Sequence, residues 1–290
     1  MKVNPMLMEL ARGEWLMDVN TLSTWSPIAY KILSGEDFSI DSSTASIMTV
    51  VDSKGVMHHP DKDGHIETPK GSVAIINMIG PILKYGDWCA YGADDIVNAL
   101  KAADNNPNIK GTVFIVDGPG GAVSAIGPFI EFAKTKTKPV IGLADEAFSL
   151  HYWALCAVSD YKMADNNVSA GFGSVGVVAS YLDNREHLEK LGFKFHDIYP
   201  DESKHKNEAV KLALEGKYDL IKKEHLSPVA IKFQDAVRAA CPSLKEATGV
   251  LTGKTFSADK ALEYGMIDGI GSLDKAIEKI HVLSEINALQ

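Results

Sequence analysis

The residue with the clearest chemical potential is Ser149, which stands between an apolar run and an Ala-rich segment. Residues 139–147 are rich in β-branched and small apolar side chains, and residues 150–157 continue with apolar and aromatic ones. This order predicts a strand, a sharp turn and a helix, with Ser149 at the turn. A serine there lies at a sheet end, and the first amides of the following helix point toward whatever its hydroxyl attacks. Ser149 is therefore a candidate nucleophile.

A glycine-rich turn, Gly118-Pro119-Gly120-Gly121, follows an earlier apolar run. It is either an ordinary connection that needs glycine's backbone freedom or a backbone anion site, because consecutive glycines let amides approach a ligand. No Gly-Lys-Ser/Thr follows, so it is not a phosphate loop. Together with a serine at the end of the next strand, the turn favours acyl transfer, which needs amide donors opposite the nucleophile.

Alternating elements are predicted to position these residues. From Lys70 onward the chain shows buried-type strands over residues 73–79, 111–117 and 140–144, and helical spacing over residues 94–103 and 122–134. This alternation predicts a largely parallel sheet covered by helices. Active groups of such sheets gather where the strands end.

Residues 1–70 differ from the rest and predict a separate unit. Apolar residues recur at helical spacing over 6–15 and 24–33, and residues 34–70 are polar. We expect a small helical lead-in and a poorly packed linker over residues 1–70, followed by an α/β domain over residues 71–290.

Composition excludes several function classes. The chain has 290 residues, of which 46% are hydrophobic, and a net charge of −9 without a long basic run. This charge argues against nucleic acid or an anionic membrane as the primary partner. Three widely spaced cysteines suit a reducing compartment, and no apolar run approaches the length of a membrane span. We expect a soluble cytoplasmic protein without a membrane anchor, metal or cofactor.

The second half of the chain supplies basic candidates. Small residues over 168–178 lead into an apolar strand, and a helix over 184–191 and a strand over 193–199 are predicted next. The polar loop that follows carries Lys204 and Lys206. Residues 207–240 have helical periodicity with an apolar stripe, interrupted at Ser227-Pro228, which is either core or a subunit contact.

Several segments resemble, in order and spacing, the signal peptide peptidase A family of serine peptidases over about residues 71–282. Within that family, the missing anchor and the Trp-containing lead-in look like the capsid-assembly (prohead) proteases of tailed phages. The resemblance implies a Clp/crotonase-like spiral of repeated β-β-α units. The matching segments are residues 117–121, Phe148-Ser149, residues 173–177, His205-Lys206 and residues 251–268.

By this resemblance Ser149 is the nucleophile and Lys206 the general base of a Ser/Lys dyad, with Lys204 as the competing lysine. A lysine can serve as a base only if desolvation keeps its amine neutral near working pH. Ser174 matches a family serine that hydrogen-bonds the lysine. The amides of Gly120, Gly121 and Leu150 would form the oxyanion hole.

The chain departs from the family directly after the serine, where glycines are usual and Leu150 and His151 stand here. A donated amide does not depend on the leucine side chain. His151 is either an alternative base or a structural or substrate-lining residue, and we favour the latter because a helical residue two places on points away from the first. The departure leaves open a catalytically weakened enzyme. Val123, Leu150 and Val175 would line apolar substrate pockets.

Three function classes follow. The first is a serine endopeptidase that processes capsid or scaffold proteins, and the second is a crotonase-type acyl-CoA enzyme with the same fold. The third is an inactive relative that keeps only the assembly. Family members form rings with catalytic sites near subunit interfaces, so we expect a homo-oligomer.

Overall fold

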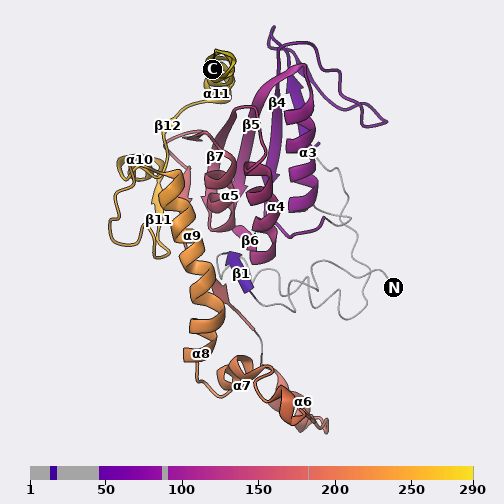
Figure 1. The fold of residues 1–290 in the computed structure, drawn as a ribbon, viewed down its shortest axis with the longest axis vertical. Coiled ribbons are helices and arrows are strands. Elements are labelled where there is room, and N and C mark those ends of the chain that lie inside the picture. The colour runs from indigo at the N-terminus through magenta and orange to yellow at the C-terminus, as the bar shows by residue number, and fades with distance from the viewer. Residues whose placement is uncertain (1–13, 18–45, 87–90, 182, 290) are drawn as a thin grey trace.

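The computed structural model describes residues 14–17, 46–86, 91–181 and 183–289 (Figure 1). The strands are β1 (Glu14–Met17), β2 (Met48–Val51), β3 (Met57–His58), β4 (Ser72–Ile79), β5 (Ile109–Gly118), β6 (Gly120–Ala122), β7 (Val140–Phe148), β8 (Tyr161–Ala164), β9 (Gly171–Gly173), β10 (Val178–Ala179), β11 (Thr255–Ser257) and β12 (Gly269–Ile270). The helices are α3 (Ala93–Asn105), η1 (Val123–Ala125), α4 (Ile126–Ala133), α5 (Leu150–Val158), α6 (Arg185–Lys190), η2 (Asp201–Ser203), α7 (Glu208–Leu214), α8 (Asp219–Ile221), η3 (Lys222–Leu226), α9 (Ser227–Ala240), α10 (Ala258–Glu263) and α11 (Leu273–Ala288). The predicted α/β class is confirmed.

Three parallel strands, β4, β5 and β7, form the centre of the main sheet. On the β4 side the sheet continues through antiparallel β2 and β3. On the other side β7 pairs with two strands in succession, because its first half lies beside β8 and its last three residues lie beside β9. The strands predicted over residues 73–79, 111–117 and 140–144 are thus confirmed as parts of β4, β5 and β7.

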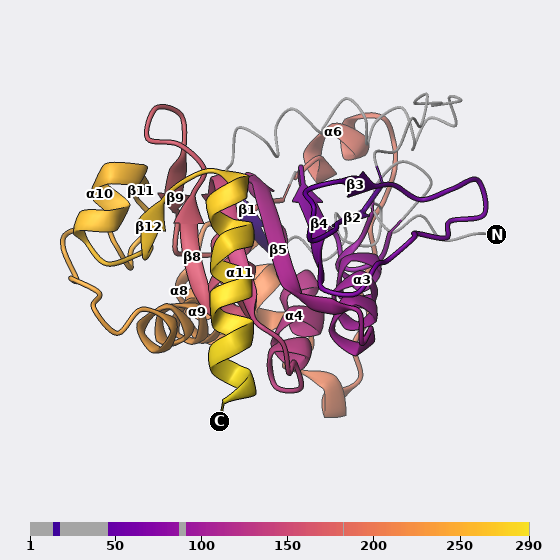
Figure 2. The same cartoon turned by 90° about the horizontal axis from the view of Figure 1, so that it is seen from above.

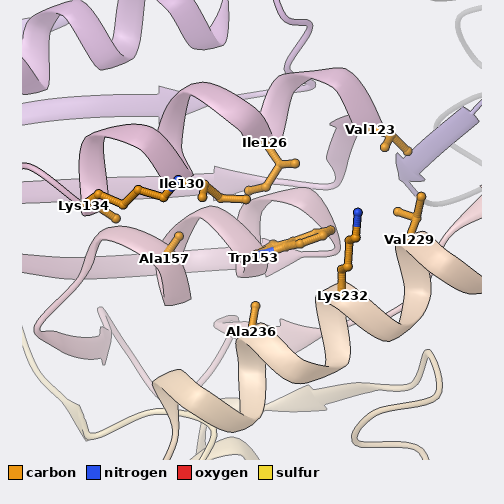
Figure 3. Close-up of a pocket in the computed structure, with 10 residues that line it drawn as sticks. Val123, Ile126, Ile130, Lys134, Trp153, Ala157, Val229, Lys232 and Ala236 are labelled. Atoms are coloured by element: carbon orange, nitrogen blue, oxygen red, sulfur yellow. The ribbon is translucent and has the colours of Figure 1, made fainter.

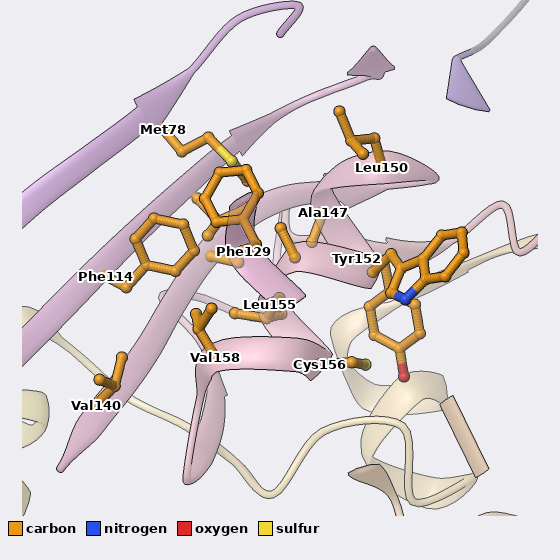
Figure 4. Close-up of a cluster of buried hydrophobic side chains, with 14 of the residues drawn as sticks. Met78, Phe114, Phe129, Val140, Ala147, Leu150, Tyr152, Leu155, Cys156 and Val158 are labelled. Carbon is orange, nitrogen blue, oxygen red and sulfur yellow. The ribbon is translucent and has the colours of Figure 1, made fainter. Parts of the chain in front are cut away.

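Helices cover both faces of this sheet, and alternation along each strand divides its side chains between the two faces. In β4, Ala74, Ile76 and Met78 belong to the large core shared with α3, α4 and α5. Val73 and Ile75 point the other way, into a smaller core closed by Ala276 and Ile280 of α11. Figure 2 shows α11 lying along that second face, and Figure 4 shows the larger core around α5.

A second, three-stranded sheet has the order β10-β1-β6. Strand β1 runs antiparallel to both neighbours: Trp15 lies opposite Ala122 of β6 and opposite Val178 of β10. The side chains of Trp15 and Leu16 are buried. The second sheet therefore joins segments from three distant parts of the chain.

Two expectations for residues 1–70 need correction. The helix expected over residues 6–15 is wrong at its end, since Glu14–Met17 is a strand; its earlier part, and the helix over 24–33, lie outside the described residues. Part of the expected linker belongs to the main sheet, because β2 pairs with β4 and buries Val50 and Val51. Strand pairing with distant segments outweighed the helical spacing. The division at residue 70 stays a prediction.

The segment from α6 to α8 forms an arm that extends away from the sheets, and α9 leads back to them (Figure 1). The strand expected over residues 193–199 is wrong: no strand forms there, and Phe193 and Phe195 are exposed. Helix α9 docks on α5, where the rings of Trp153 and Phe233 stack at 4.6 Å between centroids. In the part of the chain that the structure describes, no helix is long and apolar enough to span a membrane.

Candidate active site

Ser149 occupies the junction between β7 and α5, where the sequence predicted a sharp turn. Its backbone has φ 54° and ψ −113°, a conformation that residues with a Cβ rarely adopt. Its side chain is 2% exposed. Such strain persists only where the surrounding structure imposes it, and it is concentrated at functional sites. The conformation turns the chain abruptly from the strand into the helix.

Ser174 occupies the corresponding position on the neighbouring strand. Phe148 of β7 lies opposite Gly173 of β9, so the next residues, Ser149 and Ser174, both follow the same end of two parallel strands. Ser174 also has a positive φ, 54°. Its amide donates to the carbonyl of Lys254 at 2.9 Å. The structure thus brings these two predicted site residues to one sheet edge.

The hydrogen bonds of Ser149 direct its hydroxyl toward the segment after β9. Its amide donates to the Gly173 carbonyl at 2.9 Å, and its Oγ donates to the Gly176 carbonyl at 3.4 Å. The Trp153 amide donates to its carbonyl, which begins α5. The long hydroxyl contact leaves Oγ weakly held, as a resting nucleophile can be.

Backbone amides suited to an oxyanion flank the serine. Leu150 is the first residue of α5, and the first amides of a helix have no partner within it. On the other side, Gly118 of β5 lies opposite Ala147 of β7, which brings the glycine turn beside the serine. Gly120 has φ 120°, and a Cβ on Gly121 would lie 2.0 Å from the Ile82 carbonyl oxygen. This turn requires glycine for both conformation and space.

His151 is buried completely within the first turn of α5. Burial lowers the pKa of its imidazole to about 3, and the nearby Gly80 carbonyl acts in the opposite direction. The ring packs against the glycine turn, since a Cβ on Gly118 would lie 2.4 Å from Nε2. Neither ring nitrogen has a partner of good hydrogen-bond geometry among the described residues. The ring is neutral at physiological pH.

The structure does not bring Lys206 or Lys204 to Ser149. Both lysines are exposed, in the turn between η2 and α7. Figure 1 places this turn in the arm, apart from α5. Within the described residues, no hydrogen bond or ion pair joins either lysine to Ser149. The geometry of a single chain therefore contains the serine and the amide donors but not the predicted base.

The predicted substrate-lining residues separate into two groups. Leu150 and Val175 are buried next to the two serines. Val123 instead lines an apolar cavity of about 660 Å³ between α4, α5 and α9, together with Trp153 and Val229 (Figure 3). Sequence reasoning missed Trp15 and Leu16, which the second sheet places beside the glycine turn. Their only local signal is a short apolar run, which fits a strand or a helix equally.

Comparison with known proteins finds peptidases. The model of Peptidase family S49 matches residues 132–287, more than half of the chain. Protease 4 of Haemophilus influenzae is 26% identical over 230 residues, which cover 77% of this chain and 36% of that protein. A protein of Methanocaldococcus jannaschii described as a protease is 21% identical over 197 residues, covering 66% of this chain and 61% of that protein. The chain thus spans only part of the length of both relatives.

Among solved structures, the 1510-N membrane-bound stomatin-specific protease, in complex with a substrate peptide, is similar with a TM-score of 0.47 and 14% identity. The similarity covers 73% of this chain and 80% of that chain. A second structure of the same protease has a TM-score of 0.46 and 12% identity, and it covers 73% of this chain and 85% of that one.

Proposed function

This chain belongs to peptidase family S49, and from that premise we propose that it is a serine endopeptidase whose nucleophile is Ser149. The observation that carries the proposal is the backbone of Ser149, a non-glycine residue with φ 54° at a buried strand-to-helix turn. A serine that only capped α5 would adopt the extended backbone of an ordinary N-cap. The strain is explained if the turn presents Oγ to a substrate.

In the proposed reaction, Oγ of Ser149 attacks the scissile carbonyl while its proton passes to the amine of Lys206. The oxyanion forms opposite the amide of Leu150 and the amides that the Gly120-Gly121 turn leaves unpaired. The C–N bond then breaks, the amine product leaves with the proton from the lysine, and water hydrolyses the acyl-enzyme. Ser174, beside Ser149 at the same sheet edge, would hydrogen-bond the lysine and orient it.

The dyad requires that Lys206 reach a serine from which it is separated in one chain. We propose that a second copy of the chain supplies it, in a homo-oligomer whose active sites lie at subunit contacts. The exposed arm that carries Lys206 supports this arrangement, because an extended arm reaches a neighbour more readily than its own core.

The finer class of fold and substrate is also a proposal. The succession of strands and helices from β4 to β8, with β9 and β10 turning away beside Ser149, suits a Clp/crotonase-like spiral of β-β-α units. The sequence resemblance to phage prohead proteases suggests capsid or scaffold proteins as substrates, processed in the host cytoplasm or within the prohead. A fragment map of candidate capsid proteins after incubation with the chain tests that assignment.

A fluorophosphonate probe tests the nucleophile. We expect the probe to label the wild type and the control variant Ser243→Ala, in which an exposed serine in a turn is replaced. Ser149→Ala should lose labelling and peptide hydrolysis while remaining folded, because the hydroxyl makes only a long hydrogen bond to the Gly176 carbonyl, and losing one such bond costs about 0.5–1.5 kcal/mol. Peptide hydrolysis by folded Ser149→Ala at the wild-type rate would refute the proposal. An acyl-CoA enzyme would show no labelling at Ser149 and would bind CoA.

A further inference from the structure

Strand β1 lies in the position where a peptide substrate would have to pair. It fills the space between β6, which contains Gly120 and Gly121, and β10, which follows Ser174. An extended peptide that reached Ser149 along these segments would add as a strand to one or both of them. In this structure the chain's own residues 14–17 make that pairing.

The backbone of Gly121 is turned toward β1. The Ile82 amide donates to the Gly120 carbonyl, and the Ala122 amide donates to the Ile82 carbonyl. Because successive residues of a strand present their polar groups to opposite sides, those of Gly121 face β1, where Leu16 is the directly opposite residue. Gly121 therefore pairs with the backbone of the strand in this position, and Gly120 and Leu150 are left as donors to an oxyanion.

Both registers lead the C-terminal end of β1 toward the nucleophile. On the β6 side, Met17 lies opposite Gly120. On the β10 side, Trp15 lies opposite Val178, and the same antiparallel register continued by two residues sets Met17 opposite Gly176. The Gly176 carbonyl is the group that accepts from Ser149 Oγ at 3.4 Å. β1 thus approaches Ser149 in the direction in which the acyl part of a substrate must approach.

Strand β1 is held in this position by its side chains as well as by its backbone. Trp15 is 2% exposed and Leu16 is 0% exposed. Burying two large apolar side chains removes their surface from water and so stabilises β1 in this position. A strand tethered in the same chain also has an effective concentration of order millimolar, so it competes strongly with external peptide.

We propose that β1 is an intramolecular pseudosubstrate: residues 14–17 occupy the peptide-binding position of the Ser149 site, and external substrates must displace them. The inference rests on the proposed function, since it assigns the acyl side of that same site. The alternative is that β1 is a permanent strand of the second sheet and that substrates bind elsewhere.

A reversible crosslink distinguishes a displaceable β1 from a permanent strand. Trp15 and Val178 lie opposite each other, and Cα atoms of such pairs are about 4.5–5.5 Å apart, within the range of a disulfide. In the Trp15→Cys/Val178→Cys variant of this 290-residue chain, oxidation should hold β1 in place. We expect oxidation to lower peptide hydrolysis and fluorophosphonate labelling by about tenfold or more, and reduction to restore both.

The matched control is the Val51→Cys/Met57→Cys variant, which links β2 to β3, outside the second sheet. Its oxidation should change neither rate, and mass spectrometry establishes that each disulfide has formed. Equal hydrolysis by the oxidised and reduced forms of the Trp15/Val178 variant would overturn the pseudosubstrate. If the reduced variant fails to fold, the wild type provides the test. A peptide of residues 10–20 should compete with fluorophosphonate labelling of Ser149. If this peptide does not compete at millimolar concentration, the proposal is also overturned.

Failure of the proposed function gives a different result. In that case neither the wild type nor any reduced variant reacts with the fluorophosphonate. If Ser149 of the Trp15→Cys/Val178→Cys variant is labelled equally before and after oxidation, only the pseudosubstrate proposal is refuted, and the proposed nucleophile stands.

Discussion

At the scale of single residues, the site depends on backbone conformations that cost free energy. Ser149 and Ser174 both have φ 54°, and each follows the paired end of a parallel strand. A backbone held in a sparsely populated region costs about 1–3 kcal/mol. The surrounding sheet pairing and the buried packing of Leu150 offset that cost. The strain is thus concentrated where the two serines follow adjacent strand ends.

His151 makes the stability of the fold depend on pH. Its pKa is lowered to about 3 by burial, whereas an unfolded histidine titrates near its ordinary value of about 6.5. Between these values the unfolded chain binds more protons than the folded one, so stability is complete above about pH 6.5 and is lost as the pH falls. We expect a loss of up to about 1.4 kcal/mol per pH unit from this residue.

Urea denaturation from pH 7 to pH 4 measures this dependence, with His151→Phe as the partner variant that keeps a ring and removes the titration. The difference in unfolding free energy between wild type and variant should change steadily across the interval. Parallel pH profiles for the two proteins would show that His151 is solvated or paired in solution.

At the scale of elements, α5 is held between the sheet and α9. Its first residues present Ser149 and Leu150, and its middle carries Trp153, whose ring stacks on Phe233 of α9 with an interplanar angle of 4°. Phe233 is fully buried. This contact joins the helix that follows the proposed nucleophile to the helix that leads into the arm.

Removing the Phe233 ring should therefore destabilise the protein strongly. We expect Phe233→Ala to lower the unfolding free energy by about 3–5 kcal/mol, the usual cost of emptying a buried aromatic site. Ile231→Ala, on the same helix at an exposed position, should change it by less than about 0.5 kcal/mol. Chemical denaturation of both variants measures the effect, and similar losses in the two would place the stacked pair outside the core.

At the scale of the whole molecule, the serine and the proposed base lie in different parts of the structure. Ser149 is buried in the body formed by the sheets, and Lys206 is exposed on the arm. If neighbouring copies complete each other's sites, two inactive variants should form active sites when they assemble together. The expectation follows from head-to-tail contacts, in which each copy donates one surface and accepts another.

Co-expression of Ser149→Ala with Lys206→Ala should give about a quarter of the wild-type activity, because random assembly pairs an intact serine with a neighbour's intact lysine at that frequency. Each variant alone should be inactive. Lys204→Ala should keep full activity on its own and serves as the matched control. A mixed assembly without activity would mean that Lys206 acts within its own chain or is not the base.

Local sequence patterns determined the parts of this protein that depend on near neighbours in the chain. Continuous apolar runs predicted β4, β5 and β7, and the change of pattern at residue 149 placed Ser149 at the turn before α5. Ser174 was identified through the resemblance, and its position at the same sheet edge follows from the pairing of Phe148 with Gly173. These features depend on side-chain periodicity and turn chemistry, which are local.

Only the tertiary structure decided where distant segments meet. Residues 15–17 have apolar side chains that suit a helix or a strand, and the pairing of residues 14–17 with β6 and β10 made them a strand beside the glycine turn. The burial that keeps His151 neutral and the exposure that separates Lys206 from Ser149 likewise depend on elements far away in the chain. Contacts of this kind leave no local pattern, because the free energy that selects them comes from surfaces that exist only after the chain has folded.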